Sequence, residues 1–258
     1  MSWANLPKIT KLEPELLILP EFMAHPGCFL DIGANNGAYL WAALRRKPAK
    51  EVVAVEPIPF LAGILKRAFR GVAVHNLALT DGVGPRWLKI PDILGRTYTT
   101  RATLNVDHKE EGETGNRMIQ VETSTLDAFW KSIGDPELAC IKIDTEGHEF
   151  PVLQGAVETL KRHRPVLLVE IEQRHHKEDI GYVFEFMAAK NYAPFYFDPT
   201  FPGLRPLPPD LGAARAADPG NTSLRYLNNF LFLPPERSEV SETLALVNRR
   251  LRESARPA

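Results

Sequence analysis

The 258-residue sequence has little cysteine, almost no net charge and no long hydrophobic run. Its two cysteines, Cys28 and Cys140, both lie in apolar segments, which predicts buried side chains rather than a disulfide. The near balance of 31 basic and 32 acidic residues gives no broad basic field, so we expect no nucleic-acid partner. No apolar stretch reaches the roughly 18 residues of a membrane span, and the N-terminal residues do not resemble a secretory signal. We therefore expect a cytoplasmic protein.

What the sequence does contain is a regular alternation of short apolar, β-branched runs with segments of helical period. The runs are bounded by turn residues, and near-continuous apolar strands that alternate with amphipathic helices are typical of a parallel sheet covered on both faces. This pattern predicts a doubly wound α/β fold. The expected strands are 28–33, 51–57, 71–79, 139–144 and 166–171, and the expected helices are 38–46, 60–69, 124–133, 149–163 and 182–190.

Two parts of the chain depart from the alternation. Residues 86–123 indicate a hairpin or flap rather than a helix. Residues 198–225 form a proline-rich loop between two further strands, because proline denies a sheet its ladder hydrogen bonds. We accordingly divide the chain into an N-terminal helical segment (1–27), a sheet domain (28–235) and a C-terminal helix and tail (236–258).

The turn after the first strand, FLDIGANNGAY, is rich in glycine and polar residues. Glycine lets the chain turn sharply and lets a ligand approach the backbone at the N-terminus of the following helix. A dinucleotide-binding fold would have its first glycine where this chain has Asp31, and a carboxylate there would repel a pyrophosphate. The same carboxylate suits S-adenosylmethionine, which carries an ammonium group and no phosphate. The predicted cofactor-binding residues of this turn are Asp31, Gly33, Ala34, Asn35, Asn36 and Gly37.

Two further positions bear on a nucleoside ligand. Glu56, followed by Pro57, closes the second strand, where a carboxylate can accept both hydroxyl groups of a ribose. Asp81 follows the third strand and is either a contact to the adenine amine or a turn-forming residue. Asn35 and Asn36 have two interpretations as well, since they can bind the cofactor carboxylate or tolerate unusual backbone angles.

A cluster of acidic residues and histidine follows the fourth and fifth strands. In open α/β sheets the ligand lies outside the carboxyl ends of the strands, so these side chains are expected to face the same crevice as Gly33 and Glu56. Helix-dipole stabilisation and pairing with Lys142 are the alternative roles for these acids. Taken singly, His148, His175 and His176 are more typical of polar surface or hydrogen-bonding residues than of ligands. No metal-ligand spacing is met, so no metal site is predicted, although a divalent ion is not excluded. The candidate catalytic residues are Asp144, Glu146, His148 and Glu170.

Several of these segments together resemble the FkbM family of S-adenosylmethionine-dependent methyltransferases. The similarity runs from about Cys28 to Glu172, and IKIDTEGHEFPVLQGAVETL is its most specific part. The resemblance implies a Rossmann-like class I methyltransferase fold of seven strands, the last antiparallel, and methylation of hydroxyl oxygens on sugars or natural products. It also implies cofactor contacts from Asp31, Gly33, Asn35, Gly37 and Glu56, and a reaction centre lined by Asp144, Glu146 and Glu170. S-adenosylhomocysteine would be the product.

We therefore expect an O-methyltransferase with a small-molecule or glycan hydroxyl acceptor and a carboxylate base, Asp144 or Glu170, with His148 as the third candidate. The alternatives are an NAD-dependent oxidoreductase on the same topology and a cofactor-binding protein without catalysis that serves as an interaction module. A nucleic-acid methyltransferase is disfavoured by the balanced charge. The oligomeric state and the acceptor itself are left open.

Overall fold

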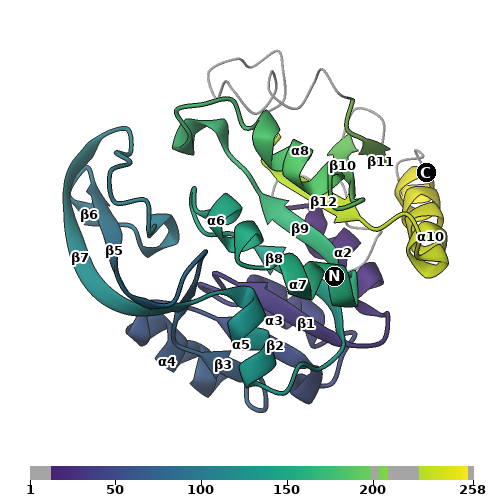
Figure 1. Cartoon of the computed structure of the whole chain (residues 1–258), viewed down its shortest axis with the longest axis horizontal. Coiled ribbons are helices and arrows are strands. Elements are labelled where there is room, and N and C mark those ends of the chain that lie inside the picture. Colours follow the sequence, from purple (N-terminus) through teal and green to yellow (C-terminus); the bar gives the residue numbers. More distant parts are fainter. Residues whose placement is uncertain (1–12, 199–202, 209–226, 255–258) are drawn as a thin grey trace.

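A large mixed sheet forms the centre of the molecule in the computed structural model, which describes residues 13–198, 203–208 and 227–254 (Figure 1). Its strand order is β11-β10-β12-β9-β8-β1-β2-β3. The pairs β9–β8, β8–β1, β1–β2 and β2–β3 are parallel, and β12 pairs antiparallel with both β9 and β10. The strands are β1 (Cys28–Ile32), β2 (Val52–Val55), β3 (Ala73–His75), β8 (Leu138–Ile143), β9 (Val166–Glu170), β10 (Ala193–Asp198), β11 (Gly203–Pro206) and β12 (Asn229–Leu233).

The doubly wound α/β architecture predicted from the sequence is confirmed, because every residue of β1, β2 and β8 is buried and helices cover both faces. One face packs on α2 (Glu15–Met23), α3 (Ala38–Ala43), α4 (Pro59–Ala68) and α10 (Ser238–Ser254). The other face packs on α5 (Leu126–Ser132), α6 (Glu149–Gln154), α7 (Val157–His163) and α8 (Gly181–Ala188). No helix in the described ranges is long and apolar enough to cross a membrane.

The sheet has one strand more than the seven expected. The additional strand, β11, lies inside the segment predicted as a proline-rich loop and pairs antiparallel with β10 at the edge of the sheet. An edge strand tolerates Pro206 because its outer side needs no ladder partner. The remainder of the predicted loop, except Asp198 and residues 207–208, lies outside the described residues, as do residues 1–12 of the N-terminal segment.

Two elements that the sequence predicts as continuous are divided in the structure. The expected strand 71–79 becomes β3 and β4 (Ala78–Leu79), which belong to different sheets. The expected helix 149–163 becomes α6 and α7, and the break falls at Gly155 and Ala156. A Cβ atom at Gly155 would lie 2.1 Å from the carbonyl oxygen of Thr80, so the close approach of these two backbones explains why glycine occupies the break.

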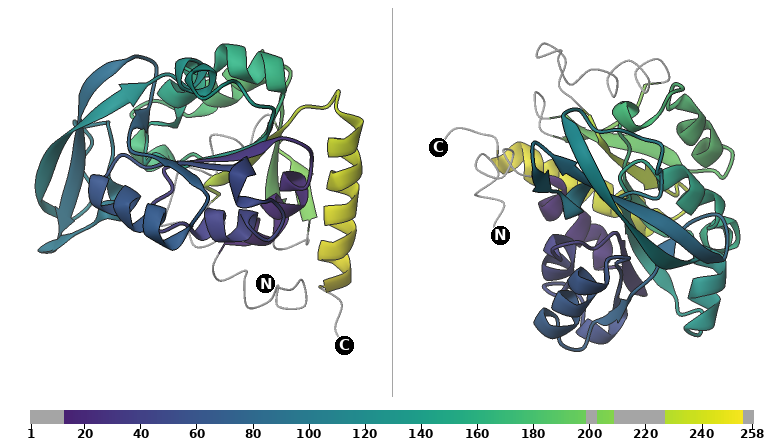
Figure 2. Two further views of the ribbon diagram at one scale, coloured as in Figure 1. Left: turned by 90° about the horizontal axis from the view of Figure 1, so that it is seen from below. Right: turned by 90° about the vertical axis from the view of Figure 1, so that its left-hand side faces the viewer.

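The flap is a second, four-stranded sheet that projects from one end of the molecule, while α10 covers the opposite end (Figure 2). Its main feature is a long antiparallel pair between β5 and β7, joined by a connection that contains β6 and η3. Ile58, Leu88 and Val121 are part of the small apolar core beneath it. The flap strands are β4, β5 (Gly84–Ile93), β6 (Arg96–Thr97) and β7 (Glu113–Ser124). The short helical turns among the described residues are η2 (Ala49–Glu51), η3 (Thr99–Arg101) and η4 (Gln173–His175).

Candidate active site

A pocket lies at the carboxyl ends of β1, β2 and β8, with the flap on its other side. The space between its lining side chains, together with the open solvent at its mouth, is about 570 Å³. The main sheet and the turns after its strands contribute Gly33, Asn35, Glu56, Pro57, Asp144, Thr145, Glu146 and His148, besides the apolar Ile32 and Val55. The flap and the segment leading to it contribute Ile58, Ala78, Leu79, Leu88, Thr99, Thr100, Ala102 and Leu104.

The charge of this lining is one-sided. Glu56, Asp144 and Glu146 are acidic, and none of the described lining residues is lysine or arginine. Such a pocket disfavours a ligand that carries phosphate groups and favours one that carries positive charge. The apolar side chains Ile58, Leu79 and Leu88 provide a surface for a planar ring. The residues present therefore fit S-adenosylmethionine better than a dinucleotide.

The glycine turn between β1 and α3 brings the backbone close to this pocket. Gly33 has a φ of +79°, and a Cβ atom there would lie 1.8 Å from the carbonyl oxygen of Asp144, so only glycine fits. Gly37, with a φ of +78°, begins α3 against the ring of Phe69. Asn35 also adopts a left-handed φ of +42°, as one of its two interpretations proposed. The turn is thus shaped by close contacts between the strand ends.

Asp31 is almost fully buried in β1, and its Oδ2 atom has no hydrogen-bond partner among the described residues. Burial raises the pKa of Asp31 to about 7, although Lys142 opposes the shift. A buried carboxylate oxygen without a donor is costly unless a ligand or water supplies one. An ammonium group would do so.

Glu56 links the second strand to the glycine turn. Its Oε2 atom accepts a hydrogen bond from the backbone N–H of Asn35 at 2.8 Å, and its Oε1 atom accepts one from Ile58 at 2.9 Å. Burial raises its pKa, while these two hydrogen bonds act in the opposite direction. Each carboxylate oxygen can accept a further hydrogen bond, so the side chain is oriented and remains able to bind a pair of hydroxyl groups.

Lys142 lies near the carboxyl end of β8 and is fully buried. Its Nζ atom is 3.5 Å from Asp144 Oδ2, 3.7 Å from Glu170 Oε2 and 5.3 Å from the centre of the Tyr39 ring. Burial opposes the charged form, but the Asp144 and Glu170 carboxylates raise the pKa of Lys142 and keep it protonated. The sequence-based idea that Asp144 and Glu170 converge from different strands agrees with their shared contact to Lys142.

The acidic turn after β8 holds its backbone through its own side chains. Glu149 accepts hydrogen bonds from the N–H groups of Thr145 and Gly147 and from the Thr145 hydroxyl. Burial, followed by the Asp144 charge, raises the pKa of Glu146 to about 9. Burial lowers the pKa of His148 to about 4, and its Nε2 atom lies 2.8 Å from Thr80 Oγ1. Glu149 therefore has a structural role in this turn, whereas Glu146 and His148 border the pocket.

Not every predicted residue borders the pocket. Asp81 accepts hydrogen bonds from Arg86 and Thr80, and its half-exposed side chain is not part of the lining. The Asn36 side chain accepts a hydrogen bond from the N–H of Ala38 at the start of α3. Ala34 donates its N–H to the Val55 carbonyl. The remaining predicted residues outside the lining are Asp31, Gly37 and Glu170.

The flap residues of the lining were not among the predicted site residues. The sequence indicates a flap at 86–123, but the residues that face inward depend on the register of β5 and β7. Thr99 shows the contact directly, since its carbonyl oxygen accepts a hydrogen bond from Asn35 Nδ2 at 3.4 Å. The alternation of apolar and polar residues along the predicted strands indicates which side chains face inward, but it gives no such indication for the η3 turn.

Comparison with known proteins identifies the family of this chain. Residues 31–194 match the model of the methyltransferase FkbM domain. Among solved structures, a methyltransferase FkbM from Methylobacillus flagellatus KT is 17% identical, with a TM-score of 0.45 over 80% of this chain and 43% of that one. A precorrin-6y C5,15-methyltransferase from Geobacter metallireducens GS-15 is 10% identical, with a TM-score of 0.39 over 86% of each chain.

The present chain spans less than half the length of the Methylobacillus protein. No curated protein matches it in sequence. The family match covers well over half of the 258 residues and includes the glycine turn, Glu56, Asp144 and Glu170. The chain belongs to the FkbM family of S-adenosylmethionine-dependent methyltransferases.

Proposed function

We propose that this protein transfers a methyl group from S-adenosylmethionine to a hydroxyl oxygen of a sugar, glycan or natural product. The observation that carries the proposal is the pocket at the ends of β1, β2 and β8, which is rich in carboxylates and has no lysine or arginine among its described lining residues. Its charge suits a cationic nucleoside, and family membership agrees with that ligand. We propose a small-molecule or glycan acceptor rather than nucleic acid, because a polyanion would be repelled by the same carboxylates.

Each cofactor contact can be assigned to a residue of the chain. Asp31 would bind the ammonium group, since its Oδ2 atom is buried and lacks a donor among the described residues. Glu56 would accept the ribose hydroxyl groups with the lone pairs that Asn35 and Ile58 leave free. When bound, S-adenosylmethionine supplies an electrophilic methyl group on a sulfonium. Water exclusion favours dispersal of the sulfonium charge, and the flap residues over the pocket provide that exclusion.

Asp144 is the carboxylate that we propose as the general base. A sugar hydroxyl is a weak nucleophile at neutral pH, so a base must take its proton. Burial and the Asp144 charge raise the pKa of Glu170, although the Lys142 ammonium opposes the shift, so Glu170 is the weaker candidate for a carboxylate that accepts a proton. Glu170 also accepts a hydrogen bond from Asn228 Nδ2 at 2.6 Å, which orients it. Asp144 lines the pocket, whereas Glu170 does not.

The test separates the base from the cofactor site. Asp144→Asn is expected to lower kcat by about 10²–10⁴-fold with little change in affinity for S-adenosylhomocysteine. Glu170→Gln is expected to have a smaller effect on kcat, because the pKa of Glu170 is raised and its side chain does not line the pocket. The assay incubates the protein with a panel of glycosides and detects products heavier by one methylene group. Near-normal turnover in Asp144→Asn would remove Asp144 as the base.

A further inference from the structure

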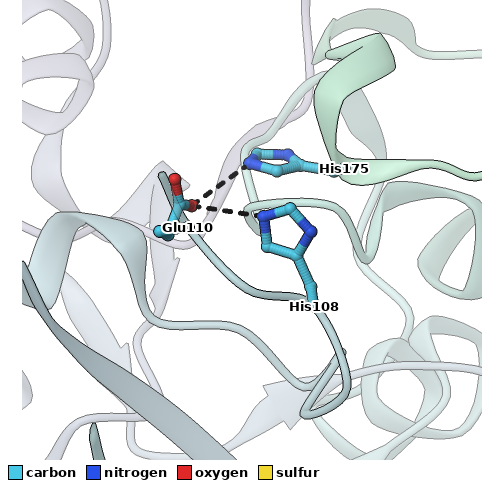
Figure 3. Close-up of side chains that lie close together, drawn as sticks. All are labelled: His108, Glu110 and His175. Carbon is cyan, nitrogen blue, oxygen red and sulfur yellow. Dashed lines mark ion pairs between the residues drawn. The ribbon is translucent and has the colours of Figure 1, made fainter. Parts of the chain in front are cut away.

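Three side chains that commonly bind metal ions meet beside the flap. His108 and Glu110 lie in the connection that leads to β7, and His175 lies in η4 after β9. His108 Nε2 is 3.5 Å from Glu110 Oε1, and His175 Nε2 is 3.6 Å from the same oxygen. The ligand atoms of all three residues lie within 4.8 Å of one another (Figure 3). Two segments far apart in the sequence thus direct their donor atoms toward one point.

Hydrogen bonding does not account for this arrangement. The Nε2 atoms of His108 and His175 are buried and have no hydrogen-bond partner in the part of the chain that the structure describes. A histidine that donates a hydrogen bond to a carboxylate approaches it closely, as His163 Nε2 does at 2.8 Å from Asp135 Oδ1 in the same structure. Separations of 3.5 and 3.6 Å are too long for that contact. The two imidazoles therefore face the carboxylate at ion-pair distance, without a hydrogen bond of ordinary length.

Two of the three donor spacings are close to those of ligands around one ion. Two atoms bound at about 2.0–2.1 Å to a tetrahedral zinc ion lie about 3.3–3.4 Å apart. The observed separations of 3.5 and 3.6 Å are close to this edge length. Two imidazoles and a carboxylate are donors that zinc and neighbouring divalent transition metals accept, whereas magnesium and calcium prefer oxygen donors alone.

Surrounding residues hold the carboxylate in this orientation. Glu110 Oε2 accepts hydrogen bonds from Arg101 at 2.5 Å and from Arg174 at 2.7 Å, and Arg174 also contacts Oε1 at 3.0 Å. Outer partners of this kind fix the orientation of metal ligands in known sites. Glu146 Oε2 lies 3.6 Å from His175 Nε2 and provides a further oxygen on the side of the pocket.

We propose that His108, Glu110 and His175 bind one divalent transition-metal ion of the zinc class, which fastens the flap to the loop after β9. The sequence predicted no metal site, because its argument relied on short-range ligand spacing and these ligands come from distant segments. A groove lined by His108, His175 and Tyr182 reaches the site from outside, so an ion and a solvent ligand can enter. The proposal does not depend on methyl transfer.

The first experiment uses the full chain after removal of metal with a chelator. Titration with Zn²⁺ should show one tight site per chain, and substitution with Co²⁺ should give the intense visible absorption of tetrahedral coordination. A crystal grown with Zn²⁺ should show an anomalous peak between His108 Nε2, His175 Nε2 and Glu110. The absence of stoichiometric Zn²⁺ binding, or a peak at another position, would overturn the proposal.

Variants identify the ligands. His108→Ala and His175→Ala should each weaken Zn²⁺ binding by at least about 100-fold, since even outer-shell partners contribute about 10–100-fold to metal affinity. His163→Ala is the matched control, because it removes a histidine that is ion-paired with Asp135 and takes no part in the cluster. Unchanged affinity in His108→Ala would contradict the assignment. If His175→Ala does not fold, His108→Ala and the Co²⁺ spectrum of the unmodified protein decide the question.

Discussion

Asp31 is the residue on which the electrostatics of the cofactor site depend most strongly. It is buried in β1, its Oδ2 atom has no hydrogen-bond partner among the described residues, and Lys142 and Asp144 are nearby charges. Burial moves its pKa from 3.8 to about 7. The buried carboxylate therefore lowers the stability of the ligand-free protein. Strongly shifted pKa values of this kind are concentrated at functional sites.

Asp31→Asn should change the pH dependence of stability. Between pH about 4 and 7 the folded state holds a proton on Asp31 that the unfolded state has lost, so the stability of the unmodified protein falls as pH rises through this window. The shift corresponds to at most about 4 kcal/mol. Urea unfolding at pH 4 and pH 8 should therefore show the variant gaining stability relative to the unmodified protein at pH 8.

Asp81→Asn is the control for this experiment, because Asp81 is largely exposed and its pKa is lowered, with hydrogen bonds from Thr80 and Arg86 outweighing burial. It should not gain stability at high pH. An Asp31→Asn variant whose stability follows that of the unmodified protein at both pH values would show that Asp31 does not carry the raised pKa.

At the residue scale, sequence reasoning found the acids of the site more readily than its histidines. Asp144 and Glu170 follow apolar strands whose carboxyl ends meet at one edge, so their proximity depends only on the parallel sheet. His175 was expected to be a polar surface or hydrogen-bonding residue, yet it is buried and its Nε2 atom has no hydrogen-bond partner among the residues described. Its neighbours His108 and Glu110 lie far from it in the sequence and reach it only through the folding of the flap. A local sequence pattern therefore cannot predict this contact.

At the scale of elements, the glycine turn controls how closely β1 and β8 approach. The Cβ atom of Gly33→Ala would meet the carbonyl oxygen of Asp144 at 1.8 Å, so the tip of β8 would have to move. We expect this variant to lower the free energy of unfolding by about 1–2 kcal/mol, because alanine disfavours the left-handed φ. The clash with Asp144 should lower it further. Thermal or urea unfolding measures the difference, and affinity for S-adenosylhomocysteine should fall with it.

Gly95→Ala provides the matched control, since Gly95 has a nearly identical φ of +77° and a Cβ atom added there would meet no described atom within 4 Å. Gly95→Ala should lower the free energy of unfolding only by the cost of placing alanine at a left-handed φ. Equal destabilisation by the two substitutions would mean that the contact with Asp144 does not constrain the turn.

The elements themselves follow the sequence pattern closely where a strand or helix is uniformly apolar or amphipathic. The patterns for β1, β8 and α10 are of this kind, and each element begins within a few residues of its predicted position. β11 could not be predicted in the same way, because Gly203 and Pro206 mark its segment as a loop and only pairing with β10 makes it a strand. The division of the 71–79 segment likewise depends on β7, which pairs with β4.

At the scale of the whole molecule, the N-terminal helix belongs to the same core as the sheet. Ile18, Leu19, Phe22 and Met23 of α2 are fully buried in the apolar cluster that covers one face. Phe22→Ala should therefore lower the free energy of unfolding by about 3–5 kcal/mol, in a single cooperative transition. Urea unfolding monitored by both circular dichroism and fluorescence tests this.

Trp41→Ala is the comparison, because Trp41 is 46% exposed and surface substitutions usually change stability by less than about 0.5 kcal/mol. A separate early transition in Phe22→Ala would show that α2 unfolds independently of the sheet, which a continuous core does not allow.

The most direct test of the account is a calorimetric titration of the full chain with S-adenosylhomocysteine, with NAD as the comparison ligand. We expect one binding site for S-adenosylhomocysteine, no measurable binding of NAD, and a loss of affinity of at least about tenfold in Glu56→Ala, which corresponds to about 1.4 kcal/mol. Tighter binding of NAD than of S-adenosylhomocysteine, or undiminished affinity in Glu56→Ala, would contradict the assignment of the acidic pocket as the cofactor site.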